Sequence, residues 1–309
     1  MRQPMSHSVL VTGGSGFIGT WVLRDLLQHG ARPVVVDPCP ALLRWERVLG
    51  SLVSEVFTAE ASLLDPASLL RVIEKYEVTH IIHLAALLTP ACQSDPFLGC
   101  QVNVLGGTSV WEAARRSERV RSISYASSYA VYGPETGDTE AAPNRPPTFY
   151  GAFKQAMDLI AEQYWRHCGI ASVAVRPHVV YGPEREVGLT AGPSLAANAA
   201  ALGESYTIGY TGQVGYDYVE DVARAFVRAA FECPSGATVV DLPGEQATTE
   251  QFARAIETVV PSAQGRIHVS GPAIPTNIPP HPRYINELFP DWRATSLGEG
   301  IRKTVEFYR

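Results

Sequence analysis

A tyrosine and a lysine four residues apart carry the clearest chemistry in this sequence. Tyr150 and Lys154 lie at the start of a strongly helical segment, 151–167, so their side chains project from one face. A phenol acting as a general base near neutral pH needs a pKa about three units below its usual value of about 10, and a neighbouring ammonium lowers it. We interpret the pair as a proton-transfer site. The alternative is an ordinary helix pair, with Tyr150 half-buried and Lys154 in solvent.

Ser128 is the expected third member of this site. It lies in a block rich in serine and tyrosine, 124–133, at the end of a predicted strand where hydroxyls face the ligand crevice. A serine hydroxyl can donate to a substrate oxygen or accept from it. The alternative is local hydrogen bonding within a turn, which serines at strand ends commonly make.

Glycines spaced three apart follow the first apolar strand and lead into a predicted helix, 16–30. Gly13 permits a sharp turn, Gly16 lets a diphosphate approach backbone N–H groups, and Gly19 lets the helix lie close to the sheet. The helix N-terminus adds the positive end of its dipole. The pattern predicts a nucleotide-phosphate cradle; the alternative is a glycine-rich turn that binds nothing.

Asp37 ends the second predicted strand, 32–37, eighteen positions after Gly19. An acid near this spacing binds the adenosine ribose hydroxyls of NAD. It would also repel a 2′-phosphate, and residues 38–40 contain no cation to bind one. The sequence therefore favours NAD over NADP, while a cap or turn residue is the alternative for Asp37.

Composition narrows the class of protein. The 309 residues are 46% hydrophobic and 18% charged, which is enough for a large core. A net charge of −6 without a basic run predicts no nucleic-acid or membrane partner, so a small-molecule substrate is expected. Five scattered cysteines without a C-x-x-C motif suggest neither a disulfide framework nor a metal site. With no apolar signal region ahead of Ser8, we expect a cytoplasmic protein.

Alternating strand and helix patterns predict an α/β fold, a doubly wound parallel sheet covered on both faces. The predicted strands lie near 8–13, 32–37, 54–59, 78–85, 119–126 and 171–177. We expect a dinucleotide-binding domain over 1–177, with a returning strand near 238–242, and a smaller C-terminal substrate-binding lobe over 178–309. Helices predicted at 218–231 and 297–307 should pack this lobe down, and 182–215 reads as Gly-, Pro- and Ala-rich connections.

Together these motifs resemble the extended short-chain dehydrogenases/reductases of the NAD-dependent epimerase/dehydratase family, over nearly the whole chain. The matching positions are 12–19, 37, 65, 83–86, 103–104, 127–133, 150–154, 176–183, 299–301 and 307–308. The resemblance implies a Rossmann sheet, an NAD cofactor and enzymatic activity. It also implies a homodimer, paired through helices matching 97–116 and 151–167. Apolar positions there are compatible with pairing but can equally face the sheet: Leu98, Val102, Leu105, Met157, Ile160 and Tyr164.

The resemblance also implies a role for individual residues. Tyr150 would be the acid/base, Lys154 its pKa partner and ribose anchor, and Ser128 the hydroxyl that orients the substrate. The implied cofactor-binding residues are Gly13, Gly16, Phe17, Ile18, Gly19, Asp37, Leu64, Asp65, Leu84, Ala85, Ala86, Asn103, Tyr150, Lys154 and Pro177. Two of the matching residues have plain alternatives, since Asp65 can be a helix N-cap before Pro66 and His83 a packed strand histidine.

Departures from the family pattern bear on the substrate. Tyr129 and Ala130 replace the Asp-Glu pair of family dehydratases, which disfavours dehydration. Val179 stands where nucleotide-sugar enzymes usually have asparagine, and Val214 aligns with the arginine that clamps their diphosphate. These losses argue against a UDP- or GDP-sugar, although Arg176 or Arg185 can compensate.

The leading hypothesis is therefore an NAD-dependent oxidoreductase that acts on a secondary alcohol of a small polyol, sugar or sugar acid, by hydride transfer assisted by Tyr150, Lys154 and Ser128. The alternative is a sugar or nucleotide-sugar epimerase with tightly bound NAD, and a third, less favoured hypothesis is a non-catalytic NAD-binding regulatory protein. Candidate substrate-binding residues, from loops expected near the crevice, are Thr89, Ser128, His178, Arg185 and Tyr218.

Overall fold

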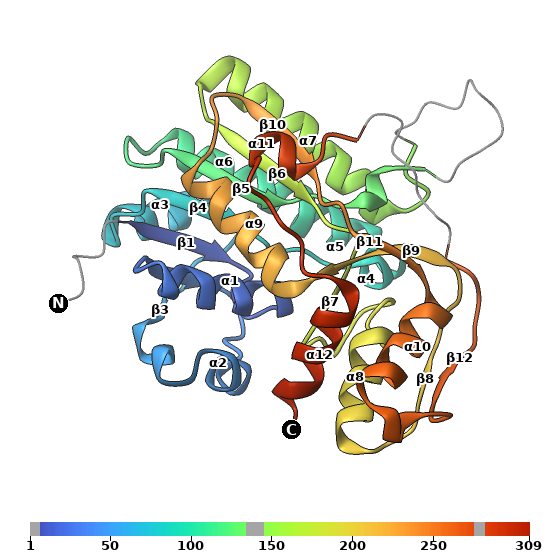
Figure 1. The fold of residues 1–309 in the computed structure, drawn as a ribbon. Coiled ribbons are helices and arrows are strands. Elements are labelled where there is room, and N and C mark those ends of the chain that lie inside the picture. Colours follow the sequence, from blue (N-terminus) through green and yellow to red (C-terminus); the bar gives the residue numbers. More distant parts are fainter. Residues whose placement is uncertain (1–6, 134–144, 275–281) are drawn as a thin grey trace. The chain divides into compact units, whose positions relative to one another are not determined.

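The computed structural model describes residues 7–133, 145–274 and 282–309 (Figure 1). The chain divides into two compact units. The first takes its described residues from Met1–Val131, Pro146–Arg176 and Ala223–Val240, and the second from Tyr132–Arg145, Pro177–Val222 and Asp241–Arg309. Among the described residues, no helix has both the length and the apolarity needed to cross a membrane.

The first unit is built on a seven-stranded sheet of order β10-β6-β5-β4-β1-β2-β3. Its strands are β1 (Ser8–Thr12), β2 (Arg32–Val36), β3 (Phe57–Thr58), β4 (His80–His83), β5 (Ser122–Ala126), β6 (Ser172–Arg176) and β10 (Ala237–Asp241). Each pair of neighbours in the order β6-β5-β4-β1-β2-β3 is parallel. The strand order reverses between β1 and β4, and doubly wound sheets bind ligands beyond the strand ends at such a point. The predicted Rossmann-type fold is confirmed.

Helices cover both faces of this sheet (Figure 1). The helices of the first unit are α1 (Phe17–Gln28), α2 (Leu42–Leu49), α3 (Pro66–Lys75), α4 (Thr89–Ser94), α5 (Pro96–Cys100), a π-helical turn (Gln101–Gly106), α6 (Gly107–Arg115), α7 (Phe149–Cys168) and part of α9 (Val219–Phe231). Apolar side chains of α3, α6 and α7 pack on alternate strand residues such as Leu10, Ile81 and Ile123, all fully buried. This core fixes α7 against β5.

The second unit contains short strands that the sequence did not reveal. A three-stranded sheet has the order β11-β9-β7, and β12 pairs with β8. Its strands and helices are β7 (Val179–Tyr181), α8 (Gly192–Leu202), β8 (Tyr206–Ile208), β9 (Gln213–Tyr218), β11 (Glu245–Thr248), α10 (Thr249–Val259), β12 (Ile267–Val269), α11 (Ile285–Leu288) and α12 (Leu297–Phe307). The segment 182–215, expected as connections, instead contains α8, β8 and the start of β9. The strand β8 has only three residues, too short for a periodic pattern, and the alanine-rich α8 is buried on most sides, so its sequence lacks a polar face.

Candidate active site

The glycine loop at the end of β1 has no room for a side chain at Gly13 or Gly19. Gly13 has a φ of 74°, and a Cβ added there would lie 2.6 Å from the Ala85 nitrogen. A Cβ on Gly19 would lie 2.2 Å from the Gly13 carbonyl oxygen. The loop therefore lies directly against the segment that follows β4 and against the first turn of α1. This is the close packing that the glycine spacing predicts.

Ser15 and Asp37 connect this loop to the end of β2. The Ser15 N–H donates to Asp37 Oδ2 at 3.2 Å, and the Cys39 N–H donates to Oδ1 at 3.1 Å. The Ser15 hydroxyl is buried but has no hydrogen-bond partner among the described residues. A buried hydroxyl without a partner is costly unless a ligand supplies one. The loop and Asp37 fit the diphosphate and ribose of NAD, which is the cofactor of the family that this chain resembles.

Two residues of α2 brace the same loop, and sequence reasoning missed both. Arg44 Nη1 donates to the Ser15 carbonyl at 2.9 Å, and Trp45 Nε1 donates to the Gly14 carbonyl at 3.1 Å. Trp45 is almost completely buried. No spacing in the sequence marks them, because the contacts form only when α2 folds back over the glycines.

The segments expected around the adenine and nicotinamide begin where β3 and β4 end. Leu64 is exposed, and Asp65 caps α3, its Oδ1 accepting the Ala67 N–H at 2.9 Å. The N-cap alternative for Asp65 therefore describes the structure, and contact with adenine stays a prediction. Residues 84–86 follow β4 directly, and the Leu84 N–H donates to the Thr12 carbonyl at 3.0 Å.

Asn103 braces the loop after β4. Its Oδ1 accepts the Leu87 N–H at 2.7 Å, and its Nδ2 donates to the Leu87 carbonyl at 2.9 Å and to Cys92 Sγ at 3.4 Å. The side chain is buried, so its amide contacts protein groups here. Thr89 is the first residue of α4 in this loop. Contact of Asn103 with a cofactor stays a prediction.

His83 is buried in the sheet, as the alternative interpretation of this residue, a packed strand histidine, predicts. Its Nδ1 lies 2.6 Å from Thr12 Oγ1, and its ring meets Trp111 edge-on at 6.2 Å. Burial, and to a smaller extent Lys154, lowers the pKa of His83 to about 3. The imidazole is therefore neutral at physiological pH.

Tyr150 and Lys154 lie in the first turns of α7. Thr148 caps the helix, its Oγ1 accepting the Gly151 N–H at 3.1 Å. Lys154 Nζ lies 5.6 Å from the Tyr150 ring centroid and donates to the Ala126 carbonyl at 2.6 Å. Lys154 is 6% exposed, so it does not extend into solvent as the alternative reading required. Burial lowers the pKa of Lys154 to about 8, while Asp158 and Cys92 oppose this shift.

Ser128 lies two residues beyond Ala126 and precedes a 3-10 turn (Tyr129–Val131); we call residues 128–131 the serine turn. Its Oγ accepts the Ala130 N–H at 3.1 Å, which is the local turn hydrogen bond given above as the alternative role of Ser128. The hydroxyl proton can still donate to a ligand. A Cβ added to Gly151 would lie 2.1 Å from the Ala130 carbonyl oxygen. Gly151 therefore lets the first turn of α7 touch the serine turn. The structure thus brings Ser128, Tyr150 and Lys154 to adjoining segments.

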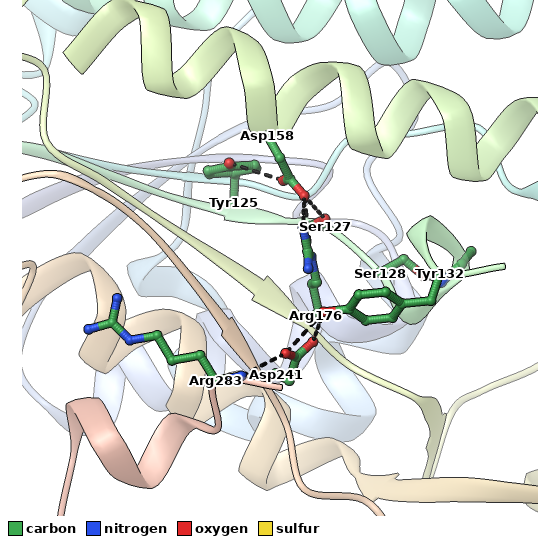
Figure 2. A network of polar contacts seen from close by, with 9 residues as sticks. Tyr125, Ser127, Ser128, Tyr132, Asp158, Arg176, Asp241 and Arg283 are labelled. Atoms are coloured by element: carbon green, nitrogen blue, oxygen red, sulfur yellow. Dashed lines mark hydrogen bonds and ion pairs between the residues drawn. The ribbon is translucent and has the colours of Figure 1, made fainter. Parts of the chain in front are cut away.

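A network of hydrogen bonds around the Asp158 carboxylate connects α7 with the ends of β5 and β6 (Figure 2). Asp158, one turn after Lys154 on α7, accepts hydrogen bonds from Tyr125 and Ser127 of the β5 end. Arg176, at the end of β6, forms an ion pair with it at 2.6 Å. Sequence reasoning missed Asp158. Its spacing of four from Lys154 and eight from Tyr150 is the signal that could have identified it.

The remaining predicted residues belong to the second unit, where each is held by its own neighbours. Pro177 begins the second segment of that unit and is buried. His178 donates its N–H to Asp217 Oδ2 at 2.8 Å, and burial lowers its pKa to about 3. Arg185 Nη2 donates to Thr190 Oγ1 at 2.6 Å. Tyr218 is buried. Contacts of these side chains with a substrate stay predictions.

A cavity of about 300 Å³ also lies within the second unit, lined in part by three carboxylates. Asp217 accepts from His178 and Gly244, Asp221 from the Thr295 N–H, and Glu245 from the Leu297 N–H. Burial raises the pKa of Asp217 to about 7. These carboxylates bind backbone N–H groups and thus connect loops of this unit. In the described chain, no group of three or more His, Cys, Asp or Glu residues is arranged to hold a metal ion.

Comparisons with known proteins agree with this geometry. The model of the NAD dependent epimerase/dehydratase family matches residues 9–264. The chain is 29% identical to a UDP-glucose 4-epimerase of Mycolicibacterium smegmatis, over 97% of this chain and 98% of that protein. It is 28% identical to a D-erythronate dehydrogenase of Cupriavidus necator, over 63% of this chain and 60% of that protein. Its structure resembles the UDP-glucose 4-epimerase of Thermus thermophilus in complex with NAD, with a TM-score of 0.79, 28% identity, and coverage of 97% of this chain and 98% of that one.

Proposed function

The chain belongs to the NAD-dependent epimerase/dehydratase family and is an NAD-dependent enzyme of the extended short-chain type; from this premise we propose that it is a sugar 4-epimerase acting on a UDP-sugar such as UDP-glucose. The observation that carries the proposal is the end-to-end likeness, in sequence and in structure, to UDP-glucose 4-epimerases. These comparisons favour epimerisation over net oxidation of a polyol, which was the leading hypothesis from the sequence.

Epimerisation needs a group that removes a proton from a substrate hydroxyl and later returns it. Bound NAD supplies the reversible acceptor for the hydride of the same carbon. The Tyr150 phenolate oxygen takes the hydroxyl proton, and the Lys154 ammonium, 5.6 Å from the phenol ring, stabilises the negative charge. The Ser128 hydroxyl donates to the substrate oxygen and orients it. When the proton returns from Tyr150 to the oxygen of the other epimer, the enzyme recovers its starting state.

The residues of the serine turn argue against the dehydratase branch of the family. Tyr129 and Ala130 occupy the positions where family dehydratases have an Asp-Glu pair. Tyr129 is buried, and the Ala130 carbonyl lies against Gly151. Ala130 has no ionisable group and Tyr129 is no carboxylic acid, so the Asp-Glu pair of the dehydratases has no counterpart here, and we do not propose dehydration.

A dehydrogenase of a small sugar acid is the second candidate, favoured by Val179 and Val214. Both positions carry diphosphate-binding side chains in nucleotide-sugar enzymes and are apolar here. Arg176 and Arg185 could replace the missing diphosphate-binding side chains, but Arg176 forms an ion pair with Asp158 and Arg185 donates a hydrogen bond to Thr190. Part of the chain also resembles a D-erythronate dehydrogenase. A carboxylate substrate would need no diphosphate site.

One paired assay separates the two candidates. The purified protein is incubated with UDP-glucose, and formation of its 4-epimer is followed by proton NMR. A parallel sample with D-erythronate and NAD is followed at the absorbance of NADH. Epimer formation without NADH supports the epimerase. Steady NADH formation with D-erythronate, together with no 4-epimer from UDP-glucose, would overturn the epimerase proposal and support the dehydrogenase.

A homodimer is proposed through exposed apolar side chains on the helices around α7. Phe97 is 74% exposed, Leu105 52% and Leu159 58%. The stripe expected on α7 partly faces the core instead: Met157 is buried in it, and Ile160 and Tyr164 pack against it. We expect Leu105→Glu to convert a dimer into a monomer in light scattering. The control Leu202→Glu, on α8 and similarly exposed at 58%, should leave the dimer intact.

A further inference from the structure

We propose that Asp158 is a positioning residue of the active site: paired with Arg176, it holds the end of β5 that leads to Ser128 and supplies the negative charge that faces the Lys154 ammonium. The inference rests on the proposed function for the roles of Lys154 and Ser128. It concerns a residue that touches neither substrate nor cofactor in that function and acts through its neighbours.

The Asp158 carboxylate is buried and fully engaged. Its side chain is 8% exposed. Oδ1 accepts from the Tyr125 hydroxyl at 3.1 Å, and Oδ2 accepts from Ser127 Oγ at 2.9 Å. Arg176 donates to Oδ2 through Nη2 at 2.6 Å and Nε at 3.2 Å. Figure 2 shows the carboxylate pointing from α7 toward the ends of β5 and β6. A buried carboxylate with four donors is held in one orientation.

These bonds attach three consecutive residues, the last two of β5 and the residue that follows it, to one face of α7. Tyr125 and Ser127 donate to Asp158, and the intervening Ala126 carbonyl accepts from Lys154 at 2.6 Å. Ser128 is the next residue along the chain. The distance between the serine turn and the helix that carries Tyr150 therefore depends on Asp158 as well as on Lys154. A displacement of about 1 Å in such a site can reduce the rate about 100-fold.

Asp158 also determines the charge around Lys154. Burial disfavours the ammonium and lowers its pKa to about 8, while Asp158 and Cys92 act in the opposite direction. The other groups facing this ammonium are His83, which is neutral near pH 8 because its pKa is about 3, and the Tyr150 ring. Without the Asp158 charge, Lys154 should lose its proton at a lower pH. Lys154 is useful to Tyr150 only while protonated, because only the ammonium stabilises a phenolate.

The chain offers a direct test because it contains only three lysines, Lys75, Lys154 and Lys303. Protein labelled with 13C at the lysine Cε gives three NMR signals, and Lys75→Arg and Lys303→Arg assign them. We expect the Lys154 signal to titrate near pH 8 in the wild type and at lower pH in Asp158→Asn. Asp158→Ser, a second neutral variant with a smaller side chain, should shift it in the same direction. Asp158→Glu should restore it toward the wild-type value.

Glu162→Gln is the matched control on the same helix. Glu162 forms an exposed pair with Arg166 there, so its removal should leave the Lys154 titration unchanged. The proposal is overturned if folded Asp158→Asn or Asp158→Ser titrates at the wild-type pH. The NMR experiment needs no substrate, so a failed epimerase assay would not affect it. With an active substrate, the alkaline fall of kcat should move to lower pH in Asp158→Asn but not in Glu162→Gln.

Discussion

The substitution Gly19→Ala should disrupt the cofactor cradle through one methyl group. The new Cβ would lie 2.2 Å from the Gly13 carbonyl oxygen and 2.8 Å from the Gly14 Cα, whereas ordinary contact begins at 3.4 Å. The loop must therefore retreat by roughly 1 Å, since these neighbours are backbone atoms with no rotamer to change. We expect a loss of NAD affinity of about 100-fold, which corresponds to about 2.7 kcal/mol.

Isothermal titration with NAD measures this loss directly. Gly298→Ala is the matched control, because a Cβ there meets nothing within 4 Å and Gly298 lies inside α12. That variant should keep wild-type NAD affinity and gain up to about 1 kcal/mol of unfolding free energy. Wild-type affinity in a folded Gly19→Ala protein would refute the assignment of 13–19 as the diphosphate cradle.

Three further substitutions test the remaining parts of the account. Tyr150→Phe should reduce kcat by about 100- to 10,000-fold, measured by NMR with UDP-glucose, while NAD affinity measured by titration stays nearly unchanged; undiminished turnover would remove Tyr150 from the mechanism. Asp37→Ser should raise affinity for NADP relative to NAD by about tenfold, because the carboxylate that repels a 2′-phosphate is gone; an unchanged ratio of the two dissociation constants would contradict this. The pKa of His83 in the folded protein, about 3, lies below its usual value of 6.5. Between these two pH values the unfolded chain binds more protons than the folded protein, so the free energy of unfolding decreases as the pH falls from 6.5 toward 3. Thermal melts between pH 7 and 4 should show a steeper fall for the wild type than for His83→Gln, and parallel curves would show that His83 is not responsible.

Much of the first unit was predictable because its signals are local. Several of its strands contain apolar runs, such as Val9–Val11 and Val34–Val36, and the spacing of the glycines between β1 and α1 is visible over seven residues. The second unit was harder. Its strands β7 and β8 have three residues each, and their burial depends on partners far along the chain.

The site divides in the same way. Tyr150 and Lys154 were predicted because a spacing of four on a helix places them together. Asp158 was not predicted, because its contacts are with Tyr125 of β5 and Arg176 of β6, which lie far from it in the sequence. Arg44 likewise braces the glycine loop from a helix whose position the sequence does not indicate.

Use of UDP-glucose deuterated at C4 tests the central claim most directly, because the proposed reaction removes and returns the hydride at that carbon. With NAD present, we predict that both epimers at equilibrium keep deuterium at C4 and that no NADH accumulates. Loss of the label from C4, or its appearance in released NADH, would contradict the proposed epimerisation.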